Sequence, residues 1–311
     1  MGSSVSSLAV PVSSATRRAF STIKGLVRTC RPWQWSKQVF VLAAPGAAGS
    51  FRDLSEVLHV LIAVAAFCLA ASAGYLFNDA RDYRADREHP RKRFRPIAAG
   101  IVPVRLAYVT CVLLTAGAIA LSWAGDSWKL AGIVAGYVAL SLSYTAYFKH
   151  VAVLDVVTVA SLFVIRAIGG AVAVNVAITH WFFIVVTVGS LYLVSGKREA
   201  EMAAAGDSAG DTRRILREYS LSYLTMMRTV SLAALITSYT GWALGRDELS
   251  HHSFPWFAVS LFPFIVAVLR YALRLDKGLG EEPEDIIRED APLLVAGLAM
   301  VALVALGTYL P

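Results

Sequence analysis

Charged residues are scarce in this sequence, and their scarcity excludes an ordinary soluble protein. Only 16% of the 311 residues are charged and 57% are apolar, whereas soluble domains average about 25% charged and roughly 45–50% apolar residues. A membrane-spanning helix needs about 20 apolar residues. The chain is therefore long enough for about eight or nine such helices with short connections, and little remains for a separate soluble domain.

Cysteines and the common catalytic signatures are also few. The chain has three cysteines, Cys30, Cys68 and Cys111, each in or beside an apolar run. An odd number in that setting argues against a disulfide framework or a metal cluster and predicts reduced packing residues. The sequence has no Ser/His/Asp order, HExxH motif or Walker-type loop, and no histidine stands out as a general base. The chemistry must then proceed without an obvious protein nucleophile.

Long apolar runs predict an all-α membrane protein with nine transmembrane helices. The first is the weakest, because its uncharged stretch is short and contains Pro45. We expect residues 1–30 to form a disordered or amphipathic cytoplasmic segment and residues 31–311 to form the nine-helix transmembrane domain. The predicted helices cover residues 35–51, 55–77, 104–124, 128–148, 151–174, 180–196, 222–245, 253–273 and 291–310.

The distribution of positive charge predicts the orientation of these helices. The 29 Lys and Arg exceed the 22 Asp and Glu, for a net charge of +7. Nearly all lie on one side of the predicted membrane, and the other side has only Arg52, Lys129 and Arg246. Cytoplasmic loops carry such an excess, so we expect a multi-pass protein of the cell (inner) membrane with a cytoplasmic N-terminus and an external C-terminus. An aromatic belt at the outer helix ends agrees with this: Trp123, Trp128, Trp181, Trp242 and Trp256.

An acidic stripe follows the second predicted helix. If that helix continues, Asn78, Asp79, Asp82 and Asp86 share an arc of about 100°, and the neighbouring arginines face the other way. Carboxylates crowded in this way repel one another unless a cation lies among them. Mg²⁺ suits such oxygen ligands and is usually shared between one or two carboxylates and the phosphates of a substrate. The stripe therefore predicts a metal site, with a solvated helix end as the alternative.

Basic residues beside this stripe predict a phosphorylated substrate. Residues 87–96 form a dense basic loop, and Lys197, Arg198 and Glu201 share a helix face after the sixth predicted helix. Cations next to a metal favour a polyphosphorylated ligand. Taken alone, the second group is also compatible with charged side chains that extend from a helix end to the membrane surface. Nucleic acid is excluded as a partner, because few aromatic residues alternate with the charges.

Some charges leave two interpretations open. Arg166 and Asp155 lie on nearly the same face of the fifth predicted helix, and an ionisable residue inside a membrane normally faces a polar cavity. Arg166 is therefore either a substrate contact or part of a structural pair between helices. The acidic loop 278–290 either begins the ninth helix, which we favour slightly, or reaches the site. Lys37 and Lys149 lie at the same membrane face as the acidic stripe.

The motif Asn78-Asp79-x-x-Asp82-x-x-x-Asp86 after the second of nine helices resembles the UbiA superfamily of intramembrane prenyltransferases, and the resemblance covers nearly the whole chain. It implies a helical bundle around a polar cavity that faces the cytoplasm. Further stretches resemble the branch that transfers phosphoribose to a lipid phosphate. They are residues 31–37, residues 86–100, Gly196-Lys197-Arg198-x-x-Glu201 and Glu282-Pro283-Glu284-Asp285-Ile286.

This resemblance implies a Mg²⁺-dependent phosphoribosyltransferase. Such an enzyme moves 5-phosphoribose from phosphoribosyl pyrophosphate (PRPP) to decaprenyl phosphate and releases diphosphate, for the synthesis of a cell-wall arabinan precursor. The acceptor phosphate is already an anion, so it can attack the sugar without a general base. The implied catalytic residues are Asp79, Asp82, Asp86 and Glu201, and the metal ligands are Asn78 and the three aspartates. The implied substrate-binding residues are Lys37, Asn78, Lys92, Arg93, Arg95, Tyr144, Lys149, Arg166, Lys197 and Arg198.

Two other functions compete with this one. Transfer of a polyprenyl group from its diphosphate to an aromatic acceptor is disfavoured, because Lys197, Arg198 and Glu201 stand where aromatic-directed members usually carry a second Asp-rich motif. A transporter or lipid flippase would show inverted repeats, which the sequence lacks. Besides the lipid bilayer and the two substrates, a homo-oligomer is one option. The sequence leaves open the oligomeric state, the prenyl chain length and the number of metal ions.

Overall fold

Helices make up the architecture of this protein. The computed structural model describes residues 14–125, 127–205, 214–250, 252–278 and 283–310, and within these ranges the regular elements are all helical. The elements are α1 (Ser14–Cys30), η1 (Pro32–Gln38), α2 (Val39–Ala48), η2 (Ser50–Arg52), α3 (Leu54–Arg81), α4 (Tyr83–Glu88), η3 (Lys92–Phe94), α5 (Val104–Ala124), α6 (Trp128–Ala146), η4 (Phe148–His150), α7 (Leu154–Ala173), α8 (His180–Ala205), η6 (Arg214–Glu218), α10 (Leu221–Leu249), α11 (Trp256–Val259), α12 (Leu261–Asp276), α13 (Pro283–Glu289) and α14 (Ala291–Tyr309).

Seven helical segments in the described residues are long and apolar enough to cross a membrane. Each agrees within a few residues with a predicted span, except that α3 and α8 run further, to Arg81 and Ala205. The other two predicted spans do not meet this measure. The first is divided into the 3₁₀ helix η1 and the ten-residue α2, which contains Pro45. The other is α10, which has 29 residues but a more polar composition.

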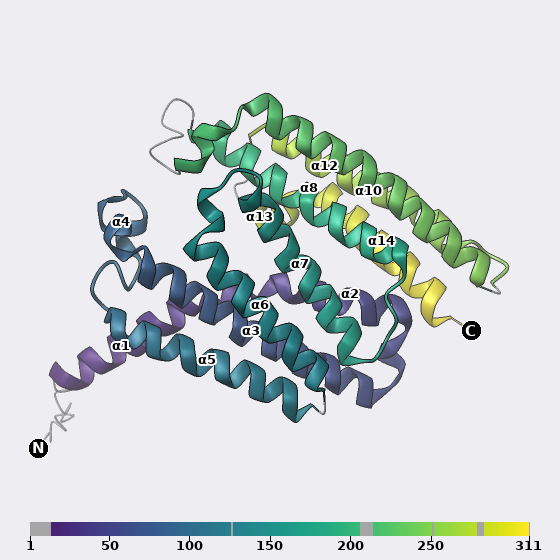
Figure 1. Cartoon of the computed structure of the whole chain (residues 1–311). Coiled ribbons are helices and arrows are strands. Elements are labelled where there is room, and N and C mark those ends of the chain that lie inside the picture. The colour runs from purple at the N-terminus through teal and green to yellow at the C-terminus, as the bar shows by residue number, and fades with distance from the viewer. Residues whose placement is uncertain (1–13, 126, 206–213, 251, 279–282, 311) are drawn as a thin grey trace, which may run out of the picture.

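The helices pack in two groups that meet at α7. Helices α3, α5 and α6 form one group, and α8, α10, α12 and α14 form the other; α2 lies along α7 (Figure 1). Each group has its own apolar core, one centred on Phe67 and Val134 and the other on Tyr239 and Phe264. Because α7 contacts both α6 and α8, polar side chains at its N-terminal end can meet residues from either group.

Residues 14–30 of the predicted N-terminal segment form a helix, and residues 1–13 lie outside the described part of the chain. Helix α1 lies against α3. The Thr22 hydroxyl donates to the Ile101 carbonyl at 3.2 Å, and Leu26 packs on the core beneath α5. Phe20 and Ile23 face outward. The helix therefore places its last residue, Cys30, and the turn after it beside the acidic end of α3.

Candidate active site

The acidic stripe lies where α3 gives way to α4. The amide of Asp82 donates to the Asn78 carbonyl at 3.0 Å, and the amide of Asp86 donates to the Asp82 carbonyl at 2.9 Å. These bonds keep the helical path nearly continuous, so the polar side chains stay on one side as the spacing predicts. Asp79 and Asp86 are buried, with 2% and 5% of their surface exposed, whereas Asp82 is more accessible.

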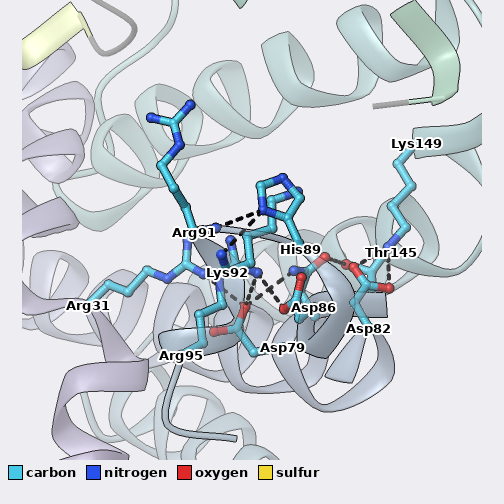
Figure 2. Close-up of polar contacts among 11 residues, drawn as sticks. Arg31, Asp79, Asp82, Asp86, His89, Arg91, Lys92, Arg95, Thr145 and Lys149 are labelled. Carbon is cyan, nitrogen blue, oxygen red and sulfur yellow. Dashed lines mark hydrogen bonds and ion pairs between the residues drawn. The ribbon is translucent and has the colours of Figure 1, made fainter. Parts of the chain in front are cut away.

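Arginine side chains compensate the two buried carboxylates. Nη1 of Arg95 lies 3.1 Å from Oδ1 of Asp79 and 2.8 Å from Oδ2 of Asp86, and Nη2 of Arg31 lies 2.8 Å from Oδ1 of Asp79 (Figure 2). Burial raises the pKa of the Asp86 carboxyl, and the Arg95 guanidinium acts in the opposite direction. The cations that offset the repulsion within the stripe are therefore side chains of this chain.

Asp82 has a different partner from a different element. Nζ of Lys149, in the connection between α6 and α7, lies 2.6 Å from Oδ2 of Asp82. The Thr145 hydroxyl, in the last turn of α6, donates to Oδ1 of Asn78 at 3.5 Å. The end of α6 thus closes over the stripe, and Figure 2 shows Lys149 on the side away from Arg31. The structure brings together the predicted residues Asn78, Asp79, Asp82, Asp86, Arg95 and Lys149.

The oxygen ligands at this site fit a metal ion shared with the phosphates of a substrate better than one held by protein ligands alone. No three His, Cys, Asp or Glu side chains in the described ranges lie close enough to form a metal cluster. The stripe is instead divided, because Arg95 joins Asp79 and Asp86 while Asp82 turns to Lys149. The carboxylate and amide oxygens are nevertheless the ligand type that Mg²⁺ prefers, and one or two carboxylates suffice where substrate phosphates complete the coordination.

Arg198 is buried in a separate network, with 3% of its surface exposed. Its Nε lies 3.1 Å from Oδ2 of Asp155, its Nη1 lies 2.5 Å from Oε2 of Glu201, and its Nη2 donates to the Tyr144 hydroxyl at 3.5 Å. The interpretation of Arg198 as a side chain extending to the membrane surface is wrong, because the guanidinium is enclosed. Two carboxylates already balance its charge, which favours a role in positioning Glu201 over a direct phosphate contact.

Asp155 is also tied to the segment after α8. The hydroxyl of Tyr219 donates to Oδ1 of Asp155 at 2.5 Å and accepts the amide of Val153 at 2.6 Å. Val153 has a φ of 69°, which a β-branched residue rarely adopts. Tyr219 therefore secures the strained turn that begins α7. Nothing in the sequence pattern pointed to Tyr219, because the contact joins residues 64 positions apart.

The contacts of Arg166 favour the structural interpretation, in which it joins helices, over a substrate contact. It is buried, and its hydrogen bonds join α7 to η1 and α6: Nε donates to Oε1 of Gln38 at 3.1 Å, and Nη2 donates to the Tyr137 hydroxyl at 2.6 Å. A third bond goes to the carbonyl of Leu162 at 3.0 Å. Asp155, on nearly the same face in the sequence, binds Arg198 and not Arg166.

The remaining predicted binding residues have contacts of their own. Nζ of Lys37 lies 3.5 Å from Oε1 of Gln34, and the amide of Lys92 donates to Nδ1 of His89 at 3.3 Å. The Arg93 guanidinium lies 4.9 Å from the ring centroid of Phe94, and Lys197 is half-buried on α8 beside Arg198.

The last residue of the acidic loop 278–290 has a structural role. Asp290 accepts the amide of Leu293 at 3.0 Å, caps α14, and lies 3.0 Å from Nε of Arg270. These bonds agree with the favoured interpretation that the loop begins the last helix. Residues 279–282 of the loop lie outside the described residues.

Arg31 is the site residue that sequence reasoning missed, although the stretch that contains it contributed to the resemblance. It has a left-handed backbone conformation, with φ 52° and ψ 60°, directly after α1 and before Pro32. Its guanidinium lies 4.8 Å from the centroid of the Tyr75 ring and pairs with Asp79. The one local signal is that helices commonly end in such a left-handed residue with proline after it.

Comparisons with known proteins agree with this geometry. Residues 39–286 match the UbiA prenyltransferase family. Decaprenyl-phosphate phosphoribosyltransferase of Mycobacterium tuberculosis is 45% identical over 93% of this chain and 96% of its own length. The protein of the same name from Corynebacterium glutamicum is 42% identical over 92% of this chain and 87% of its own.

A solved structure shares the fold at low sequence identity. The UbiA homologue of Archaeoglobus fulgidus, bound to DMAPP and Mg²⁺, superposes with a TM-score of 0.68 at 16% identity, covering 92% of this chain and 99% of that one. The prediction of a UbiA-type helical bundle is confirmed at the level of the fold.

Proposed function

The chain belongs to the UbiA prenyltransferase family of multi-pass membrane proteins, and we propose that it is a decaprenyl-phosphate phosphoribosyltransferase. It transfers 5-phosphoribose from PRPP to decaprenyl phosphate and releases diphosphate, which supplies a lipid-linked precursor of cell-wall arabinan. The observation that carries this proposal is 42–45% identity, along 92–93% of the chain, to proteins of that name.

The reaction is a substitution at C1 of the ribose. An oxygen of the acceptor phosphate forms a bond to C1 while the bond from C1 to the diphosphate breaks, and the electron pair leaves with the diphosphate. The nucleophile is an anion at neutral pH, so no side chain has to remove a proton. What the protein must supply is positive charge where several phosphates meet.

The residues at the end of α3 suit that task. Asn78, Asp79, Asp82 and Asp86 would hold Mg²⁺, which neutralises charge on the leaving diphosphate when bound. Arg95 and Lys149 lie against these carboxylates and can turn their hydrogen bonds to phosphate oxygens. Glu201 is held by Arg198, and we assign it to the ribose hydroxyls. We assign the remaining phosphate contacts to Lys37, Lys92, Arg93, Tyr144 and Lys197.

We further propose that α2 and α10 complete a nine-helix bundle in the cell membrane. Although α2 is short, it packs against α7, and α10 packs along α8. An odd number of spans puts the two termini on opposite sides of the membrane, and we assign the N-terminus and the acidic stripe to the cytoplasmic side and the C-terminus to the outside. The concentration of Lys and Arg on the side of the stripe supports this orientation.

The decisive experiment is a transfer assay with purified protein in detergent. It measures the movement of label from ribose-labelled PRPP into the organic phase in the presence of decaprenyl phosphate and Mg²⁺, with and without EDTA. We expect transfer that EDTA abolishes. No transfer by folded protein, together with activity on a prenyl diphosphate and an aromatic acceptor, would establish prenyl transfer instead.

A pair of variants separates the site from the fold. We expect Asp82→Asn to lower turnover about 100-fold, the size of one lost electrostatic contribution to a transition state. Because Asp82 is partly exposed, the variant should keep its thermal stability. Asp276→Asn, at an exposed position at the end of α12, should behave as the wild type. Equal activities of the two variants would remove Asp82 from the mechanism.

A further inference from the structure

A cavity of about 220 Å³ lies next to Asp79, between the end of α1, the turn into η1 and the loop around η3. Four arginines line it: Arg28, Arg31, Arg91 and Arg95. The lining contains one carboxylate, Asp79, whose Oδ1 already accepts hydrogen bonds from Arg31 and Arg95. Counting Asp86, which pairs with Arg95, four arginines lie with two carboxylates at this cavity. Arginine side chains that line one cavity repel one another unless an anion lies between them.

Two separate segments build the cluster. Arg28 and Arg31 come from the last turn of α1 and the residue after it, whereas Arg91 and Arg95 flank η3. Cations are favourable at the C-terminus of a helix, which accounts for the first pair without any ligand. It does not account for the second pair, which comes from a loop that ends no long helix. The convergence of both pairs on one cavity therefore needs another explanation.

The backbone holds these arginines in place. Arg31 has a left-handed conformation, and its guanidinium is fixed between the Tyr75 ring and Asp79. Nδ1 of His89 accepts the amides of Arg91 and Lys92 at 3.2 and 3.3 Å (Figure 2), which fixes the backbone that leads into η3. Contacts within the chain therefore hold the Arg31 guanidinium and the backbone of Arg91 in place.

We propose that this cavity binds a phosphate monoester group of one of the two substrates, an inference that rests on the proposed function. Arginine binds phosphate oxygens through paired N–H groups. Sites that enclose a whole drug-sized ligand measure roughly 300–1,000 Å³, so this smaller cavity suits a charged group and not an entire substrate. Trp33 also lines the cavity and is largely exposed, which gives the molecule carrying the phosphate an apolar surface.

Two groups in the reaction have this chemistry. One is the 5-phosphate of PRPP, which takes no part in bond breaking and would anchor the donor. The other is the phosphate of the polyprenyl acceptor. Both are phosphate monoesters, and kinetics can distinguish them because each belongs to a different substrate.

The test uses Arg28→Gln and Arg91→Gln, since both side chains are exposed. Arg31 and Arg95 are unsuitable, because their removal would leave the buried Asp79 uncompensated. The controls are Lys24→Gln, an exposed residue on the helix that carries Arg28, and Arg84→Gln, an exposed residue on α4; neither lines the cavity. The measurements are kcat, KM for PRPP and KM for decaprenyl phosphate, with calorimetric titration of ribose 5-phosphate and of decaprenyl phosphate in detergent.

We expect each cavity variant to raise one KM about tenfold, the effect of one lost charged hydrogen bond, with kcat and the other KM near wild type. A higher KM for PRPP with weaker ribose 5-phosphate binding assigns the cavity to the donor. A higher KM for decaprenyl phosphate assigns it to the acceptor. Unchanged KM values, or equal effects in the controls, would overturn the proposal.

Failure of the proposed function would give a different pattern. In that case the wild type transfers no phosphoribose, and the titrations alone decide. Binding of either phosphate that is lost in Arg91→Gln and kept in Arg84→Gln retains the cavity as a phosphate site. Absence of such arginine-dependent binding for both compounds overturns it.

Discussion

Single charged side chains at the α3 end of the bundle owe their roles to partners from distant segments. Asp79 and Asp82 are three residues apart, yet one is buried against Arg31 and Arg95 and the other meets Lys149. The aspartates were predictable from spacing alone. Their division into two environments was not, because Arg31 comes from the turn after α1 and Lys149 from the connection after α6.

His89 yields a prediction about pH. Burial, followed by the charge of nearby Lys92, lowers the pKa of the His89 imidazole below its ordinary value of 6.5. Nδ1 accepts two backbone amides only while it carries no proton. Because the folded-state pKa is lowered, the stabilisation that His89 gives the loop is complete above 6.5 and is lost as pH falls through the lowered value.

Amide hydrogen exchange at Arg91 and Lys92 would measure this effect. The measured quantity is the protection factor, the ratio of the intrinsic to the observed exchange rate. We expect the protection factors of both amides in the wild type to fall as the pH drops below neutral. His89→Asn is the matched control, because its side-chain oxygen can accept the same amides without titrating. The same pH dependence in both proteins would show that His89 does not hold the loop.

At the scale of elements, the largest difference between the predicted and the observed helices is at α2. The apolar run from Gln38 to Phe51 predicts one span, but η1 and the ten-residue α2 occupy it. Proline at position 45 lacks the N–H that would continue the ladder of a longer helix. The place of α2 against α7 depends on a close backbone approach that hydropathy does not reveal.

Gly170 tests that approach. A Cβ atom at this position on α7 would lie 1.8 Å from the carbonyl oxygen of Val41 on α2. The backbone of Val41 cannot move aside as a flexible side chain could, so the methyl group would push α2 and α7 apart. We therefore expect Gly170→Ala to lower the free energy of unfolding by about 3 kcal/mol. Thermal unfolding in detergent measures the loss.

Gly132 on α6 is the matched control, because a Cβ there would meet no atom within 4 Å. Gly132→Ala should be neutral or should stabilise the protein by about 0.5–1 kcal/mol, since alanine favours the helix. Equal unfolding temperatures for the two variants would contradict the close packing of α2 on α7.

At the scale of the whole molecule, the asymmetry of positive charge predicts the orientation in the membrane. We expect alkaline phosphatase fused after Pro311 to be active in cells and a green fluorescent protein fused there to be dark. Fusions after Gly278, which precedes the last predicted span, should show the reverse. A fluorescent C-terminal fusion would contradict the proposed topology, because nine crossings from a cytoplasmic N-terminus end outside.

The resemblance to the UbiA family, the helical membrane class and the acidic stripe were readable from the chain without coordinates. Each depends on local composition or on spacing within one helix, and such patterns involve residues that are close together in the sequence. The Asp motif keeps its side-chain arrangement because the helical path continues through Asp82.

The partners of the charged residues were decided by tertiary structure. Arg166 is a link between helices, Arg198 is enclosed by Asp155 and Glu201, and Arg31 joins the acidic stripe. All are arginines in or beside apolar helices, and no sequence pattern separates them. Electrostatic energy depends on distance and burial, and both are set only when helices far apart in the chain come into contact.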